Sequence, residues 1–117
     1  MTMAHPKLFE MSFTQIYEMY VQKVERKDKS KAELDQVLSW LTGYDEHKLD
    51  DLVASDIMLG DFVDQAKFNE NATLITGMIC GVRVEEITEP RMQKIRYMDK
   101  LVDELARGKK MTSILRQ

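Results

Sequence analysis

Apolar residues recur at helical spacing along most of this chain, and the recurring segments are bounded by capping residues or glycines. In one segment, Ser30 and Glu33 have the spacing of a capping box, and Gly43 stands where a left-handed residue ends a helix at low cost. The apolar residues between them, at positions i, i+3, i+4 and i+7, are Leu34, Val37, Leu38 and Leu41. This pattern predicts a helix over residues 31–42 and favours a bundle of short helices.

A helix over residues 13–27 is predicted upstream of that segment. Ser12 and Gln15 have the spacing of another capping box. The expected buried stripe consists of Phe13, Ile16, Tyr17, Tyr20 and Val24. The charged run 25–29 is too polar for a core and serves as the connection to the next helix.

Two shorter helices are expected after Gly43. Asp45 is placed to cap the first of them, which carries Leu49, Leu52 and Val53. The second covers residues 57–66 and contains Gly60, which costs about 1 kcal/mol relative to alanine inside a helix. A turn is predicted at residues 69–71.

Residues 72–87 allow two interpretations. Leu74, Ile75, Met78, Ile79 and Val82 fit a buried helix, whereas the alternation and β-branching of residues 82–84 also fit a strand. A shift of the sequence by 38 residues favours the helix and indicates a duplicated helix–glycine turn–helix hairpin. The matched pairs are Val37 with Ile75, Leu41 with Ile79, Gly43 with Gly81, Tyr44 with Val82, and Leu49 with Ile87.

The C-terminal part predicts the longest helix, over residues 89–107. Thr88 is expected to cap it, Pro90 fits its first turn, and Gly108 ends it. A short amphipathic tail with Met111, Ile114 and Leu115 must then pack on the chain's own core or on another copy. These three residues are the expected self-association surface.

Length and composition bound the architecture. The chain has 117 residues, of which 44% are hydrophobic and 32% are charged, so one globular domain over residues 1–117 is expected. Residues 1–10 are expected to be flexible or loosely packed. The predicted fold is a compact all-α orthogonal bundle of five or six helices, with two helix–glycine turn–helix hairpins and a long C-terminal helix. Neither a membrane-spanning run nor a secretory signal stands out, so a cytoplasmic location is expected.

Charge is distributed unevenly along the chain. The net charge is +2 over residues 1–31, −10 over residues 32–90 and +5 over residues 91–117. Blocks of opposite sign favour contact within the chain or between copies over binding to nucleic acid. Nine methionines, which suit adaptable contact surfaces, also favour a protein partner, most simply a second copy in a homodimer.

The sequence offers little catalytic chemistry. Cys80 lies among apolar residues and is interpreted as an inert packing thiol. His47 shares a helix face with Asp50 and Asp51, but surface charge explains this cluster better than a metal site does. No phosphate-binding glycine loop, nucleophile elbow or zinc-protease motif appears, so no cofactor, metal site or catalytic residue is predicted.

Residues 72–98 also have a helix-turn-helix pattern, which raises DNA binding as a second function. In that interpretation Glu85, Glu86 and Glu89 would meet the phosphates at the start of the second helix, against Arg83 and Arg91. Three carboxylates at this position are a serious handicap for a nucleic-acid partner.

Several strings of residues resemble the small bacterial family known as domain of unknown function 2200. The strings are residues 11–13, 40–44, 74–77, 79–87, 95–97 and 99–105, which together span nearly the whole chain. The resemblance implies a compact bacterial cytosolic protein and brings no established activity with it.

The preferred function is therefore a non-catalytic protein-interaction module that self-associates. A helix-turn-helix nucleic-acid binder and a small-molecule enzyme of unspecified type are the alternatives. Within the resembling strings, the polar residues that no structural role demands are Arg83, Arg96 and Tyr97, and these form the candidate polar surface site. The structural alternative for Arg83 is an ion pair with Glu86 or Glu89.

Overall fold

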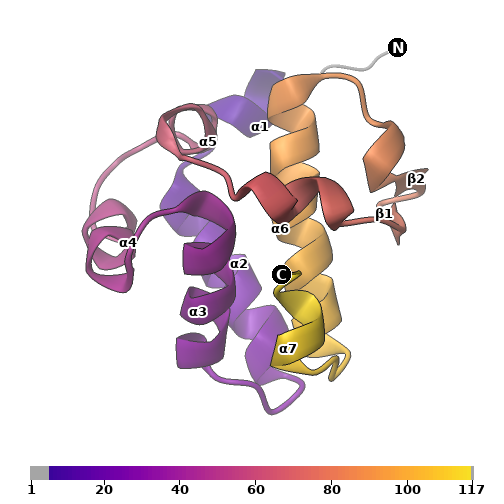
Figure 1. Cartoon of the computed structure of the whole chain (residues 1–117). Helices are drawn as coiled ribbons and strands as arrows, with labels where there is room; N and C mark the ends of the chain where they lie inside the picture. The colour runs from indigo at the N-terminus through magenta and orange to yellow at the C-terminus, as the bar shows by residue number, and fades with distance from the viewer. Residues whose placement is uncertain (1–5, 117) are drawn as a thin grey trace.

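Seven α-helices, two 3-10 helices and one short β-hairpin make up residues 6–116, the part of the chain that the computed structural model describes (Figure 1). The α-helices are α1 (Pro6–Glu10), α2 (Phe13–Glu25), α3 (Lys31–Thr42), α4 (Glu46–Val53), α5 (Leu59–Gln65), α6 (Pro90–Ala106) and α7 (Met111–Ile114). The remaining elements are η1 (Glu70–Leu74), β1 (Met78–Ile79), β2 (Val82–Arg83) and η2 (Val84–Glu86). The predicted all-α bundle is confirmed. None of the helices described is both long and apolar enough to cross a bilayer.

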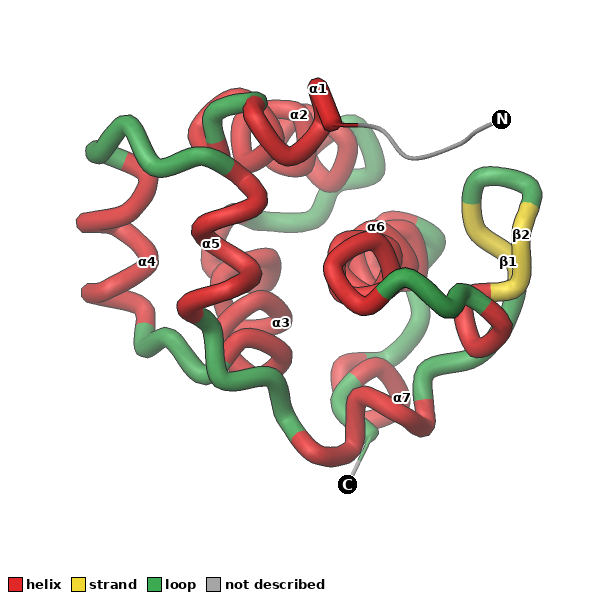
Figure 2. The backbone as a smooth tube through the Cα atoms, turned by 90° about the horizontal axis from the view of Figure 1, so that it is seen from above, coloured by secondary structure: helices red, strands yellow, loops and turns green. Residues whose placement is uncertain are grey.

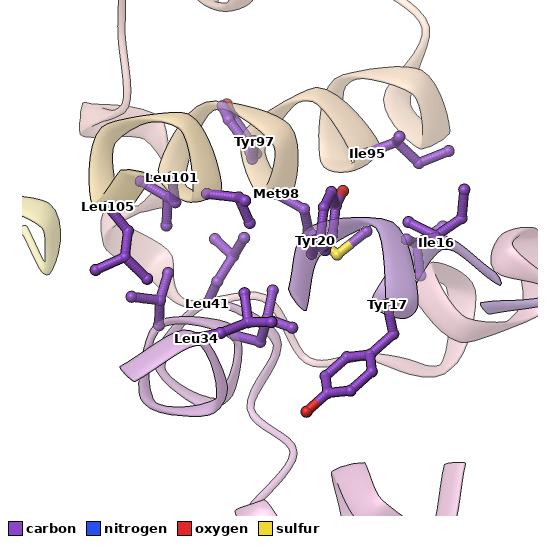
Figure 3. Packing of buried hydrophobic residues seen from close by; sticks show 14 of the residues in the cluster. Ile16, Tyr17, Tyr20, Leu34, Leu41, Ile95, Tyr97, Met98, Leu101 and Leu105 are labelled. Carbon is purple, nitrogen blue, oxygen red and sulfur yellow. The ribbon is translucent and has the colours of Figure 1, made fainter. Parts of the chain in front are cut away.

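Helix α6 is the element on which most of the others pack. It contacts α2, α3, α5 and α7, and it also contacts β1 and η2. Seen nearly along its axis, α6 has the helical bundle on one side and the hairpin on the other (Figure 2). Its buried stripe, which includes Ile95, Met98 and Leu101, faces Tyr20 of α2 and Leu41 of α3 (Figure 3). Each such large apolar side chain contributes about 1.5 to 3 kcal/mol on burial, so this seam carries much of the stability.

The predicted boundaries of α3 are confirmed at both ends. Ser30 Oγ accepts a hydrogen bond from the backbone N–H of Glu33 at 3.1 Å, and the Glu33 carboxylate accepts one from Ser30 N–H at 3.0 Å. Gly43 ends the helix in the left-handed region with φ +79°. Asp45 then caps α4 by accepting from Lys48 N–H at 2.7 Å, as the sequence predicts.

The predicted capping box at the start of α2 is wrong. The Ser12 side chain makes no capping hydrogen bond, and the N–H of Gln15 donates to the backbone oxygen of Ser12. Ser12 instead forms an antiparallel bridge with Met58. Backbone bonds from residue 13 N–H to the oxygen of residue 57 (2.9 Å) and from residue 59 N–H to the oxygen of residue 11 (2.7 Å) flank this bridge. Pairing with a distant segment therefore fixes this helix start.

The cap of α6 is also one residue later than predicted. Glu89, and not Thr88, is the N-cap, and its carboxylate accepts from the backbone N–H groups of Arg91 and Met92 at 3.0 and 3.2 Å. Pro90 occupies the first helical position, as predicted. A carboxylate at this end interacts favourably with the helix dipole as well as with the free N–H groups.

The second helix–glycine turn–helix hairpin, predicted over residues 72–87, is not formed. A 3-10 turn is followed by two antiparallel strands, in which residue 78 pairs with 83 and residue 79 with 82. The two connecting residues, Cys80 and Gly81, have φ of +52° and +83°. Two consecutive positive φ values are typical of a two-residue type I′ hairpin turn, which the twist of paired strands favours. The proposed duplication fails here, because Gly43 ends a helix whereas Gly81 lies in a strand connection.

Both ends of the described chain pack on the bundle. Residues 1–5 lie outside the described residues, but α1 contacts α5, and Leu8 and Phe9 are partly buried against the core. At the other end, Ile114 is fully buried and joins the main core. Arg116 then forms a two-point ion pair with Glu104 of α6, with N–O distances of 2.6 and 2.8 Å.

One buried polar cluster joins α2 to α3. The hydroxyl of Tyr17 donates to the Asp35 carboxylate at 2.5 Å, and Lys31 donates to the same carboxylate at 2.8 Å. Burial, together with the neighbouring carboxylate, raises the pKa of Tyr17 to about 12. This cluster satisfies a buried charge inside the bundle and opens into neither of the surface hollows described below.

Candidate functional site

A hollow of about 770 Å³ lies between the hairpin, the N-terminal half of α6 and α1. Its charged lining residues are Arg83, Glu86, Glu89 and Arg96. Its apolar lining residues are Phe9, Met78, Val82, Ile87 and Met92. This volume lies in the range of ordinary ligand and peptide sites, and apolar side chains form most of its walls.

A smaller hollow of about 320 Å³ adjoins the first, and the two share Cys80 and Arg96 as lining residues. Its apolar lining includes Met19 of α2, Leu8 of α1 and Ile79 of β1. We refer to the two hollows together as the hairpin groove. The groove therefore runs along one side of α6, from α2 past the hairpin to the start of α6.

The hairpin that forms one wall of the groove is tied to the bundle mainly through its base. The N–H of Val84 donates to the oxygen of Gly77 at 2.9 Å, and Val84 itself is fully buried. Lys100 of α6 donates to the oxygen of Met78 at 3.2 Å. A Cβ at Gly77 would lie 3.1 Å from the Lys100 side chain, so the close approach and the φ of +113° both favour glycine there.

Glu85 organises the base of the hairpin. Its carboxylate accepts from the backbone N–H of Gly77 at 3.0 Å and from Arg83 Nε at 2.8 Å. These bonds stabilise the charged form, so the Gly77 N–H and then the Arg83 guanidinium lower the pKa of Glu85 to about 2. The ion-pair partner of Arg83 is therefore Glu85, whereas the structural alternative considered from the sequence was a pair with Glu86 or Glu89.

We expect a direct titration of Glu85 to show this low pKa. Because the pKa of Glu85 is lower in the folded state, its carboxylate stabilises the fold at pH values above its unfolded-state pKa of about 4.3. This stabilisation is lost as the pH falls toward about 2. Side-chain carbon shifts measured by NMR should give a midpoint near pH 2. Arg83→Gln should raise this midpoint only partly, because the Gly77 N–H remains. A midpoint above pH 4 in the wild type would contradict the hairpin geometry.

Arg96 forms the floor of the groove and is held by a chain of polar contacts. Its Nη1 lies 2.7 Å from the Asp99 carboxylate and 3.4 Å from the Cys80 sulfur. Asp99 also accepts from the hydroxyl of Tyr20 at 2.6 Å. Burial raises the pKa of Tyr20 well above its usual value, so this hydroxyl remains a donor at neutral pH. Asp99, which is itself bonded to Tyr20, therefore holds the Arg96 guanidinium in place.

The structure brings together two of the three candidate site residues. Arg83 and Arg96 both line the larger hollow, whereas Tyr97 is buried and lines neither hollow. The interpretation of Cys80 as a buried packing thiol is wrong. It is exposed in the hairpin turn, because the strands and not a buried helix carry it there.

The other sequence candidates lie away from the groove. His47 Nε2 is 3.8 Å from Asp51, and both side chains are mostly exposed. Residues 6–116 contain no group of three or more His, Cys, Asp or Glu residues arranged to hold a metal ion. In the predicted self-association segment, Ile114 packs in the chain's own core, and Met111 and Leu115 are partly buried against it.

The helix-turn-helix over residues 72–98 is not formed, because residues 78–83 are a β-hairpin. Of the two arginines considered for phosphate contact, Arg83 pairs with Glu85 and Arg91 pairs with Asp64 at 3.1 Å. The Arg91 guanidinium also lies over the ring of Phe9, 4.6 Å from its centre. These cations take part in structural contacts, so the motif gives no support to nucleic-acid binding.

The exposed apolar residues of the groove were not predicted from the sequence. Met19, Met78 and Val82 have exposed fractions of 59%, 52% and 46%. One signal in the sequence points to Met78 and Val82: the Cys80–Gly81 pair stands between β-branched residues, a pattern that favours a hairpin turn. Side chains that flank such a turn are exposed.

Comparison with known proteins assigns the chain to a family. A family model described as an uncharacterised protein conserved in bacteria, domain of unknown function 2200, matches residues 7–116. The chain belongs to this family. The resemblance noted in the sequence is thereby confirmed.

A solved structure shares both the fold and much of the sequence of this member of the domain of unknown function 2200 family. The crystal structure of the uncharacterised protein SP1917 superposes on this chain with a TM-score of 0.91, and the two sequences are 43% identical. The match covers 97% of this chain and 94% of the SP1917 chain. No curated protein is significantly similar to the chain. The family and its fold are therefore established, and the function must be argued from the site.

Proposed function

We propose that this chain is a non-catalytic protein-interaction module of the bacterial cytoplasm, and that the hairpin groove binds apolar side chains of its partner. The observation that carries the proposal is the exposure of Met78 and Val82 at the edge of an apolar-walled hollow of about 770 Å³. Exposed apolar side chains that line one hollow are costly to leave in water, and on soluble domains such surfaces commonly mark a binding site.

The composition of the groove supports a protein partner. Three methionines, Met19, Met78 and Met92, line its two hollows. Methionine side chains are flexible and polarisable, so they adapt to the side chains that they contact. The larger hollow is lined by two arginines and two glutamates, so it has no strong preference for an anionic or a cationic ligand.

The charged groups of the groove are engaged in ways that do not favour catalysis. Arg83 is paired with Glu85, Arg96 is paired with Asp99, and Glu89 caps α6. A general acid and base pair needs titratable groups that are directed at a substrate with matched pKa values. Three of the four charged residues that line the larger hollow therefore have structural partners, and most of its walls are apolar, which does not favour a small-molecule enzyme.

Selection of binding peptides tests this function. Peptides from a displayed random library that bind the wild-type chain should carry several apolar residues. Met78→Asp should weaken their binding at least about tenfold, because it places a charge against the apolar contact, and tenfold corresponds to about 1.4 kcal/mol.

Leu74→Asp is the matched control, because Leu74 is exposed to a similar extent, 54% against 52% for Met78, but lines neither hollow. Peptide binding to Leu74→Asp should equal that of the wild type. Failure to recover any binding peptide, or equal losses in both variants, would contradict the proposed function.

A further inference from the structure

We infer that the partner in the hairpin groove is a second copy of this chain, with the hairpin of each copy seated in the groove of the other. This inference rests on the proposed function and names its partner. It also differs from the self-association surface expected from the sequence, which involved Met111, Ile114 and Leu115.

The shape of the surface supports a two-fold arrangement. In a two-fold dimer the same patch meets itself, so a protruding part and a hollow must lie side by side on one surface. Met78 and Val82 are about half exposed on the hairpin, and the hairpin is itself one wall of the larger hollow. A two-fold axis beside the hairpin therefore packs each hairpin against the apolar walls of the other copy's groove. The dimer then needs no second binding surface on either copy.

The charges of the groove are also self-complementary. Arg83 and Glu86 both line the larger hollow, and both are exposed. The described residues give Glu86 no ion pair, and the ion pair of Arg83 with Glu85 is made through Nε. The other nitrogens of that guanidinium can still donate, because a guanidinium carries five N–H groups. A two-fold axis therefore lets Arg83 of each copy meet Glu86 of the other.

The hairpin can serve in this way without disturbing the bundle. Its tip residues are exposed, whereas its anchor, Val84, is fully buried and the carboxylate of Glu85 holds its base. Side chains at the tip can therefore bury apolar surface against a partner while the base stays fixed. Preorganisation of this kind lowers the entropy cost of association.

Charge reversal at Arg83 and at Glu86 tests the inference. The wild type should sediment and scatter light as a dimer, at about twice the 13.7 kDa of one chain, as its concentration rises. Arg83→Glu and Glu86→Arg should each raise the dimer dissociation constant roughly 10- to 100-fold, because either change makes both symmetry-related contacts repulsive. Mixing the two variants should restore a dimer that contains one copy of each, since both contacts are then attractive.

Two exposed residues at the end of α2, outside the groove, provide matched controls. Lys27→Glu and Glu25→Arg change the net charge by the same amounts but lie away from both hollows, so they should remain dimeric. Val82→Asp should give a monomer with unchanged helical circular dichroism, because Val82 is 46% exposed in the single chain.

The possible failures separate the inference from the proposed function. A chain that stays monomeric at every concentration, but whose groove binds selected peptides, would overturn the second copy as partner and leave the interaction module standing. A dimer that is insensitive to Arg83→Glu, Glu86→Arg and Val82→Asp would overturn the groove as its interface. Variants that dissociate but form no mixed dimer would overturn the two-fold pairing of Arg83 with Glu86.

Discussion

Replacing Gly43 by alanine is expected to lower the free energy of unfolding by about 2 to 3 kcal/mol. Gly43 has φ +79°, a conformation that costs roughly 1 to 2 kcal/mol for a residue with a Cβ. The added Cβ would also lie 2.5 Å from the backbone oxygen of Lys67, which must then move. That shift weakens the bond from Lys67 N–H to the oxygen of Thr42, now 2.9 Å, and adds about 1 kcal/mol.

Gly108→Ala provides the control for backbone conformation alone. Gly108 also has a positive φ, +89°, but a Cβ there would meet nothing within 4 Å. Its alanine variant should therefore lose only the conformational cost of about 1 to 2 kcal/mol. Urea unfolding followed by circular dichroism measures both losses. Equal losses would show that the approach of Lys67 to the end of α3 contributes nothing.

The second large effect is expected at the C-terminal ion pair. Arg116→Met should cost about 3 kcal/mol, because it leaves the carboxylate of Glu104 buried without its main partner. Lys109, 3.4 Å away and partly exposed, compensates only in part. The Arg116 backbone oxygen also accepts from the Asn71 side chain at 3.1 Å, so loss of the pair should loosen the segment after α7 and its hydrogen bond to η1.

A double-mutant cycle isolates the pair. Arg116→Met combined with Glu104→Met should cost clearly less than the sum of the two single changes, because the double variant buries no unpaired charge. Limited proteolysis should cut the Arg116→Met variant near residues 107–110 faster than the wild type. Additive losses, with unchanged proteolysis, would show that the last residues do not depend on this pair.

Local signals in the sequence were sufficient for much of the bundle. The Ser30–Glu33 capping box, the glycine at 43 and the aspartate at 45 each act on their own backbone neighbourhood, so both ends of α3 and the start of α4 are as predicted. The start of α2 was not predictable in this way. It depends on pairing with Met58, 46 residues away, which removes the need for the Ser12 side chain.

The hairpin groove was not predicted because its apolar residues suit two structures. Residues 74–82 have enough apolar side chains for a buried helix, but the chain turns instead at Cys80 and Gly81, which both have positive φ. Because residues 78–83 form a β-hairpin, Met78, Cys80 and Val82 are exposed. The predicted helix–glycine turn–helix hairpin is therefore absent from this segment. Arg83 and Arg96 line the same hollow, whereas Tyr97, one residue further around α6, is buried.

The central claim is that this chain binds its partner through the hairpin groove. Backbone amide shifts of the isotope-labelled chain, recorded while a peptide selected on the wild type is added, test it most directly. The account predicts that the shifted amides cluster at residues 78–96 and around Phe9 and Met19, with α3 and α4 unchanged. Shifts centred on α3 and α4, or on α7, would contradict it.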